Sequence, residues 1–178
     1  MQLSGFLKLF DYHIIIGLIT VIAAWKWGDW RNWKLYYPTM LFIALGNLTY
    51  CLLTCNFPLW QYESPLLQTT TINLLTSLIG FPLTILIYLT YFPKILAKQI
   101  MYIVAWIAYF TLAEWLSYKL EFFSYHNGWN IWWSLLFNCI MFPTLWLHHK
   151  RPLWALSFSL VVAVFVLIYF KVPFSSMK

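Results

Sequence analysis

The sequence predicts an all-α integral membrane protein, built as a single-domain bundle of about six transmembrane helices. Of the 178 residues, 62% are hydrophobic and only 9% are charged, which is too little charge to cover a soluble surface. Aromatic residues make up 22% of the chain, and Trp and Tyr gather where a bilayer meets water. Apolar runs of about 20 residues, the length that crosses a bilayer core, follow one another with short connections.

Six apolar segments are the expected membrane helices, and they cover residues 6–25, 37–54, 67–92, 95–118, 131–147 and 153–170. The first is the weakest, because Lys8, Asp11 and His13 occupy its opening turns. No cleavable signal peptide is apparent, so we expect this segment to remain as a membrane helix. The connections are short and polar, and the segments are too long for barrel strands. We therefore expect one helical domain over residues 1–178.

The basic residues predict which side of the membrane each connection occupies. With the amino terminus outside, the cytoplasmic connections hold seven of the eleven Lys and Arg residues, namely Lys26, Arg31, Lys34, Lys94, Lys98, Lys150 and Arg151. Because cytoplasmic loops carry the excess of basic residues, both termini are predicted to be extracytoplasmic. Indoles alternate with basic residues in 25–34, and His148 and His149 precede Lys150. Both stretches are expected to contact lipid headgroups.

Polar side chains recur on single helical faces and indicate the bundle interior. In segment 67–92 they recur every three or four residues, beside Pro82, which should bend this helix. Amides that faced lipid would leave hydrogen bonds unmet. The expected buried polar stripe comprises Asn47, Thr69, Asn73, Ser77, Thr84, Ser134 and Asn138. It either lines a polar path or the wall of a cavity, or it lets helices approach and hydrogen-bond. The last segment has no such stripe and is expected to face lipid.

Glu114 is the strongest single candidate for a functional residue, because an ionisable residue at membrane depth is usually paired with another group or faces water. It lies near the end of the fourth segment, and His126 in the next connection is the nearest titratable partner in sequence. Consecutive helices usually pack antiparallel, so we expect Glu114 and His126 to share a water-accessible pocket on the outer side. The alternative is a carboxylate that is simply hydrated at the interface.

The stretch YHNGWNIWWSL, residues 125–135, combines aromatic rings with a turn signal. Asn127-Gly128 predicts a turn, and Asn127 or Asn130 could cap the following helix. The tryptophans would then lie at the headgroup level. Aromatic walls with a few convergent polar groups also describe a ligand pocket. The candidate ligand-binding residues are therefore Glu114, His126, Asn127, Trp129, Asn130 and Trp133.

At YYPTMLFIALGN (36–47), FPLW (57–60) and YHNGWNIWWSLLFNCIMFPTLWLHHKRP (125–152), the chain resembles an uncharacterised family of small multi-pass membrane proteins from spore-forming Bacillus- and Clostridium-like bacteria. The resemblance runs from about residue 25 to 155, and its last segment is the most specific. It implies a bacterial cytoplasmic membrane and transfers no activity and no catalytic residue.

Three functions are compatible with these residues. The leading interpretation is a non-enzymatic membrane protein whose outer aromatic and acidic surface binds a lipid, a small ligand or a partner protein. The first alternative is a small transporter or channel with the polar stripes lining its path. The second is a membrane enzyme that uses Glu114 and His126 on a lipid-borne substrate. The cysteines lack metal-site spacing, and no nucleotide-binding or hydrolase motif appears. We therefore expect no metal, no cofactor and no nucleic-acid partner.

Overall fold

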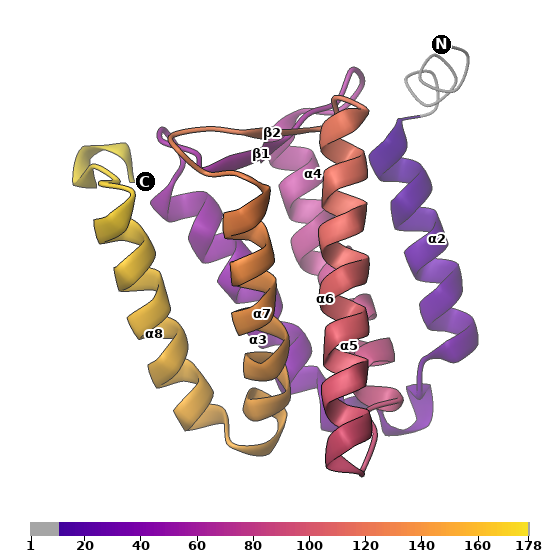
Figure 1. Ribbon diagram of the computed structural model, residues 1–178. Helices are drawn as coiled ribbons and strands as arrows, with labels where there is room; N and C mark the ends of the chain where they lie inside the picture. Colours follow the sequence, from indigo (N-terminus) through magenta and orange to yellow (C-terminus); the bar gives the residue numbers. More distant parts are fainter. Residues whose placement is uncertain (1–10, 178) are drawn as a thin grey trace.

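The computed structural model describes residues 11–177 and is a bundle of helices with a two-stranded sheet at one end (Figure 1). In chain order the helices are α2 (Tyr12–Trp27), α3 (Trp33–Leu53), α4 (Thr69–Leu75), α5 (Phe81–Thr90), α6 (Leu96–Lys119), α7 (Ile131–Lys150) and α8 (Pro152–Tyr169). Short 3₁₀ segments are η1 (Trp30–Asn32) and η3 (Phe174–Ser176). The helical class is confirmed, and the sheet, β1 (Trp60–Tyr62) with β2 (Phe123–Tyr125), is an addition that the sequence did not predict.

Within residues 11–177, five helical segments are long and apolar enough to cross a membrane, and they are Trp30–Leu53, Thr69–Thr90, Leu96–Lys119, Ile131–Lys150 and Pro152–Tyr169. The remaining apolar helix, α2, has 16 residues and is therefore about 24 Å long. Residues 6–10 of the expected first segment, with Lys8, lie outside the described residues. These lengths and compositions fit a multi-pass membrane protein.

The third expected segment is a single helical rod interrupted by a π-helical turn. This turn, η2 (Thr76–Gly80), lies between α4 and α5, and the backbone N–H of Phe81 donates to the carbonyl of Thr76, five residues earlier. Pro82 comes next and has no backbone N–H to donate. The helix is thus distorted beside the proline that the sequence indicated, and the distortion takes the form of a π turn.

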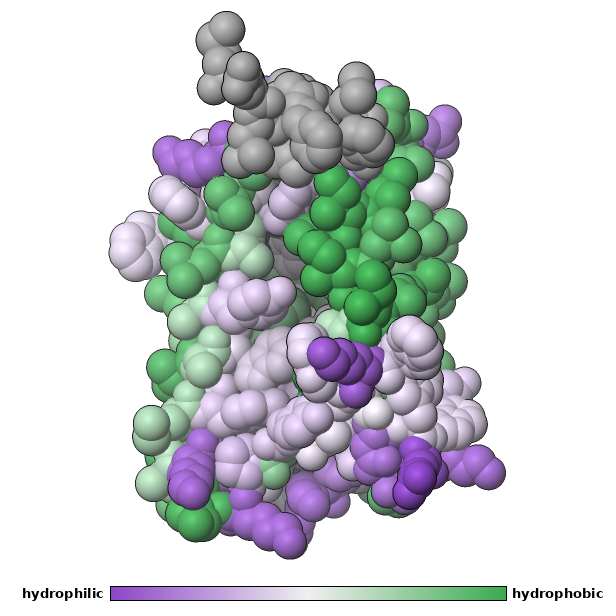
Figure 2. All heavy atoms as spheres, turned by 90° about the vertical axis from the view of Figure 1, so that its right-hand side faces the viewer, coloured by the Kyte–Doolittle hydropathy of each residue, from purple (hydrophilic) through white to green (hydrophobic). Residues whose placement is uncertain are grey.

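The two ends of the bundle differ in charge. The β1–β2 sheet and the described chain ends, Asp11 and Met177, lie at one end, here called the sheet end (Figure 1). The α2–α3, α5–α6 and α7–α8 connections lie at the other, here called the basic end. It carries seven of the eleven basic residues, Lys26, Arg31, Lys34, Lys94, Lys98, Lys150 and Arg151. Figure 2 shows hydrophilic residues gathered along this lower edge.

Two separate apolar clusters hold the helices together. The basic-end cluster joins α3, α5 and α7 through Met40, Ile85, Leu86, Tyr88, Leu89, Phe142 and Leu145. Its buried phenol, Tyr88, donates to the carbonyl of Phe142 at 3.0 Å, so its polar tip keeps a partner. The sheet-end cluster consists of Leu59, Trp129, Phe170 and Val172. Within α8 only Ala155 is buried, as expected for a segment at the periphery.

Gly28 provides a test of the packing between α2 and α5. A Cβ atom at Gly28 would lie 2.5 Å from the carbonyl oxygen of Ala24 and 2.7 Å from Cδ2 of Leu86. Gly28→Ala should therefore reduce the free energy of unfolding by about 1–3 kcal/mol, the usual cost of overpacking. Thermal unfolding in detergent measures this loss. Gly46→Ala is the matched control, because a Cβ there meets nothing within 4 Å and alanine favours the helix. Equal losses in both variants would contradict this packing.

Candidate ligand cavity and its polar end

A cavity of about 1160 Å³ lies inside the bundle. Its walls come from all the helices from α2 to α8, from η2 and from the sheet, and most of the side chains in them are aliphatic or aromatic. The polar wall residues at the sheet end include His13, Tyr50, Glu114, Ser117 and Ser134, and those toward the basic end are Thr144 and His148. The cavity is therefore mostly apolar, with hydrogen-bonding groups at both ends and a few, such as Asn47, Thr84 and Asn138, between them.

The cavity is open sideways, toward the surface that lipid would cover. Its lining includes exposed side chains of α2 and α8, such as Leu18 (58% exposed) and Leu160 (66% exposed). Helix α2 packs against α5 and η2, whereas α6 packs against α7. At the sheet end the hydroxyl oxygens of Tyr12 on α2 and Ser117 on α6 are hydrogen-bonded at 2.9 Å. Figure 2 shows a hollowed surface on the side of the bundle where α2 and α6 lie.

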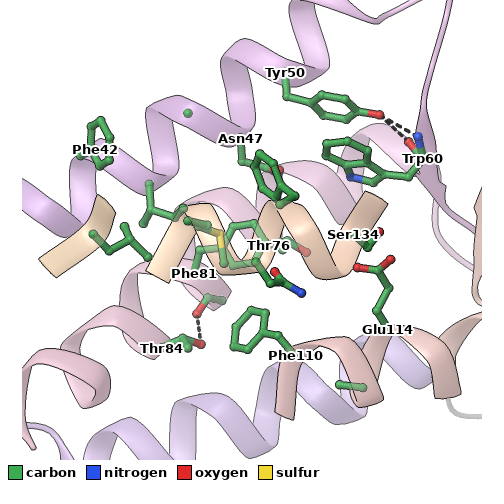
Figure 3. A pocket seen from close by; sticks show the side chains of 18 of the residues that line it. Phe42, Asn47, Tyr50, Trp60, Thr76, Phe81, Thr84, Phe110, Glu114 and Ser134 are labelled. Atoms are coloured by element: carbon green, nitrogen blue, oxygen red, sulfur yellow. Dashed lines mark hydrogen bonds between the residues drawn. The ribbon is translucent and has the colours of Figure 1, made fainter. Parts of the chain in front are cut away.

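Glu114 extends from α6 into the sheet end of the cavity (Figure 3). The hydroxyl of Tyr125 donates to its Oε1 atom at 2.7 Å. The hydroxyl of Ser134 on α7 faces the same carboxyl group and accepts a hydrogen bond from Nε1 of buried Trp129 at 2.8 Å. A carboxylate has about four acceptor sites. After its contacts with Tyr125 and Ser134, Glu114 can therefore still accept hydrogen bonds from a ligand.

Tyr125 acts as a fixed hydrogen-bond donor to Glu114. Burial raises the pKa of the Tyr125 hydroxyl well above its usual range, and the hydrogen bond to Glu114 raises it further. A phenol with a raised pKa stays protonated throughout the physiological range, so it keeps its proton to donate. The ring is held by aromatic neighbours, with centroids 5.0 Å from Tyr118 and 5.4 Å from Phe123.

The two-stranded sheet positions Tyr125 beside Glu114 of α6, and Tyr50 in turn fixes the position of the sheet. Strands β1 and β2 pair antiparallel, with Trp60 opposite Tyr125. The Tyr50 hydroxyl, near the end of α3, donates to the carbonyl of Trp60 at 2.8 Å. It also accepts from the backbone N–H groups of Leu59 at 3.1 Å and Trp60 at 2.9 Å. The rings of Tyr50 and Trp60 stack with centroids 3.7 Å apart (Figure 3). Helix α3 thus fixes β1, and β1 fixes β2.

Asn127, Gly128 and Asn130 form the turn that begins α7. Asn127 and Gly128 have positive φ angles of 50° and 86°, in the left-handed region that Asn and Gly tolerate. The Asn127 side chain donates to the carbonyl of Pro58 at 2.8 Å. Asn130 Oδ1 accepts from the backbone N–H groups of Trp132 and Trp133 at 3.0 and 3.3 Å, so Asn130 is the N-cap. Both asparagines lie outside the cavity lining and support the fold.

The structure does not bring His126 and Glu114 together, so the expected pocket with this pair is wrong. His126 is exposed, and its Nε2 lies 2.8 Å from Oγ of Ser124, which donates to Glu63 Oε1 at 2.7 Å. Successive side chains of an extended segment point to opposite faces, so Tyr125 and His126 diverge. Tyr125 therefore takes the position beside Glu114 that we expected for His126.

The tryptophans of the 125–135 stretch divide between cavity and periphery. Trp129 is buried and lines the cavity together with Glu114. Trp133 lies outside the lining and packs on Tyr169 and Phe170, with centroid distances of 4.7 and 5.2 Å. Trp132 is 74% exposed. The stretch therefore contributes one cavity wall, one contact to the chain after α8 and one indole on the outer surface.

The polar stripe contributes both cavity wall and contacts between helices. Asn47, Thr84, Ser134 and Asn138 line the cavity. The Asn47 amide donates to Oγ of Ser77 at 2.8 Å, which joins α3 to η2. The Asn138 amide donates to Oγ1 of Thr111 at 3.1 Å, which joins α7 to α6. The same residues therefore both line the cavity and form hydrogen bonds between helices.

Thr69, Asn73 and Ser77 lie outside the cavity lining. The Thr69 hydroxyl donates to the carbonyl of Tyr62 at 3.3 Å and so ties α4 to β1. Asn73 is half-buried, and its backbone carbonyl accepts from the hydroxyl of Ser77 at 2.6 Å. These residues of the stripe hold the third segment in place.

His148 lies inside the bundle, so the expectation that it contacts headgroups is wrong. It is 6% exposed, its Nδ1 lies 3.0 Å from Oγ1 of Thr39, and its ring stacks on Phe42 with centroids 4.2 Å apart. His148 follows Ser134 by 14 residues, about four helical turns, which places both on one face of α7. The spacing from Ser134 could therefore have predicted from the sequence that His148 faces the bundle interior.

Tyr50 and Tyr125 are the site residues that sequence reasoning missed, whereas Trp60 was a candidate that the pocket could recruit. Tyr125 belongs to the 125–135 stretch, where only its aromatic character was counted. Its partner Glu114 is 11 residues earlier, across a chain reversal, and no helical or strand period connects the two. For Tyr50 no local pattern distinguishes this tyrosine from the others of α3.

Comparison of the chain with models of known protein families, with characterised protein sequences and with solved structures gives no significant match. The cavity and its contacts are therefore the basis for proposing a function.

The contact between Tyr125 and Glu114 can be tested by removing one hydroxyl. Tyr125→Phe should lower the free energy of unfolding in detergent by about 1–3 kcal/mol, because the carboxyl group loses a donor. The control is Tyr109→Phe, which removes a phenol that is 60% exposed on α6. Chemical unfolding followed by Trp fluorescence measures both variants. If the two lose the same stability, the hydroxyl of Tyr125 does not support Glu114.

Proposed function

We propose that this protein is a non-enzymatic, multi-pass protein of the bacterial cytoplasmic membrane that binds an amphipathic, lipid-like molecule in its central cavity. The observation that carries the proposal is the cavity itself, with about 1160 Å³ of volume, mostly apolar walls and Glu114 among the polar groups at its sheet end. Five apolar helices of sufficient length support the membrane setting. The resemblance to small multi-pass proteins of spore-forming bacteria supports the bacterial membrane.

The size and walls of the cavity favour a ligand with a long hydrocarbon part. Small-molecule pockets usually measure about 300–1,000 Å³, and this cavity is larger, at about 1160 Å³. Apolar walls that face a void lose dispersion contacts, and a hydrocarbon chain restores them without burying unpaired polar groups. The sideways opening, lined by exposed apolar side chains of α2 and α8, lets such a chain pass between the bilayer and the cavity within apolar surroundings.

The sheet end of the cavity favours a polar group that donates hydrogen bonds, such as an amine or a hydroxyl. Glu114 is a hydrogen-bond acceptor held in place by Tyr125 and Ser134. The rings of Trp60 and Trp129 lie 4.7 Å apart in the same part of the lining. Indole faces attract cations, so an ammonium group would contact both the carboxylate and the rings.

A small transporter or channel is the second candidate, because polar wall residues continue along α7. Ser134, Asn138, Thr144 and His148 all line the cavity and connect its two ends. A transporter would move its substrate into liposomes, whereas a binder would retain it. The third alternative, an enzyme that uses Glu114 and His126 together, has lost its geometric basis because these side chains are apart.

Ligand binding is tested by mass spectrometry of lipids that copurify with the protein in native membrane patches. We expect wild-type protein to retain a lipid-like amphiphile. Glu114→Gln should reduce its occupancy roughly tenfold or more, the effect of losing a hydrogen bond to a charged group. Gly17→Phe should also reduce it, because a Cβ at Gly17 meets nothing within 4 Å, so the ring would extend into the cavity.

The matched control is Val164→Phe, which adds a ring at an exposed position of α8 outside the cavity lining. Loss of ligand in Val164→Phe as large as in Gly17→Phe would contradict binding in the cavity. Flux into liposomes that is abolished by Asn138→Leu would identify the protein as a transporter instead.

Both termini are proposed to be extracytoplasmic, because the basic end carries seven of the eleven Lys and Arg residues. The test places single cysteines at Ser175 and Lys34, both exposed, in a variant whose native Cys51, Cys55 and Cys139 are replaced by serine. A maleimide that cannot cross membranes should label intact cells at position 175. Labelling at position 34 but not at 175 would reverse the orientation.

A further inference from the structure

A second pocket, of about 340 Å³, lies at the basic end and shares no lining residue with the central cavity. It forms where the start of α3, the α5–α6 connection and the end of α7 meet. Its lining includes Tyr36, Phe92, Lys94, Trp146, His149 and Lys150. The pocket thus brings together three regions that are far apart in the sequence.

The walls of this basic-end pocket are held by aromatic stacking and by a side-chain amide. Phe92 stacks on Trp146 with ring centroids 5.5 Å apart, and Tyr36 stacks on His149 at 5.7 Å. The side-chain amide of Gln99 donates to the carbonyl of Pro93 at 3.0 Å, which fixes the backbone just before Lys94. The pocket is therefore a formed feature of the helix packing.

The charge of the basic-end pocket is positive. Lys94 comes from the α5–α6 connection and Lys150 from the end of α7, and no Asp or Glu is among the described residues that line the pocket. The acidic residue of this end of the bundle, Asp29, accepts hydrogen bonds from the backbone and the amide of Asn32 at 3.3 and 2.9 Å. It also lies 3.5 Å from the hydroxyl of Tyr36. Two lysines therefore line the pocket without a carboxylate in its wall.

We infer that the basic-end pocket binds a phosphate group, either of an anionic phospholipid headgroup or of a free phosphate. Two lysines are suited to a compact, multiply charged anion, and basic pockets between membrane helices on the cytoplasmic side bind anionic headgroups. Exposed indoles at the same end, Trp25 (77%), Trp27 (51%) and Trp30 (44%), are typical of headgroup depth. This site is independent of the ligand proposed for the central cavity.

The experiment uses the full-length protein in nanodiscs of phosphatidylcholine, with or without phosphatidylglycerol, and in detergent with inorganic phosphate. Native mass spectrometry and thermal unfolding report binding. We expect the wild-type protein to retain phosphatidylglycerol in preference to phosphatidylcholine. The double variant Lys94→Gln/Lys150→Gln should bind it roughly thirtyfold more weakly, from about fivefold for each lysine near an anionic surface.

The matched control is Lys34→Gln/Lys98→Gln, which removes the same charge from the basic end at positions outside the pocket lining. Binding close to wild type in this control supports the site. Stabilisation by inorganic phosphate that depends on Lys94 and Lys150 would identify free phosphate as the ligand. Equal losses in the two double variants, or no binding of either probe, would overturn the site. Glu114→Gln should leave this binding unchanged, so the result is separate from that for the central cavity.

Discussion

The hydroxyl group of Tyr50 is the contact on which the sheet end of the molecule depends. It donates to the carbonyl of Trp60 and accepts from the backbone N–H groups of Leu59 and Trp60. A short strand at the edge of a helical bundle must satisfy its backbone groups, and one phenol on α3 satisfies several of them. Because β1 pairs with β2, the same phenol also sets the position of Tyr125, and through it that of the Glu114 carboxyl group.

The cavity exists because large side chains join the helices near the two ends of the bundle. Tyr88 and Phe142 fill the basic-end cluster, and Leu59 and Trp129 fill the sheet-end cluster. Between them the cavity wall includes small residues, among them Gly17, Gly46, Gly80 and Ala113. The helices therefore leave a space of about 1160 Å³ between them that is open to the surface, and this space is the basis of the proposed ligand site. The π turn that ends at Gly80 contributes to this wall, and such turns are frequent at functional sites.

Much of the fold and part of the candidate site could be predicted from the sequence. Apolar length placed the helices, and the polar stripe correctly assigned Asn47, Ser134 and Asn138 to the interior, because an amide that faces lipid has no partner. Glu114 was predicted either to belong to a pocket or to be hydrated at the interface, and the structure places it in the cavity lining. The partner predicted for Glu114 was wrong. His126 is close to Glu114 in sequence, but this closeness does not determine which face of an extended segment the His126 side chain occupies. His148 was misplaced because its basic neighbours outweighed its helical spacing from Ser134.

The sequence by itself determined the helical class, the approximate helix bounds, a capped turn at Asn127 or Asn130 and the separation of basic residues to one end, because each depends on local composition, period or capping chemistry. Only the tertiary structure decided that Tyr125, and not His126, contacts Glu114, that Tyr50 holds the sheet, and that Lys94 and Lys150 line one pocket. These contacts join residues from different helices and connections. They depend on how the helices cross and on which way each loop turns, and no local period of the chain encodes either.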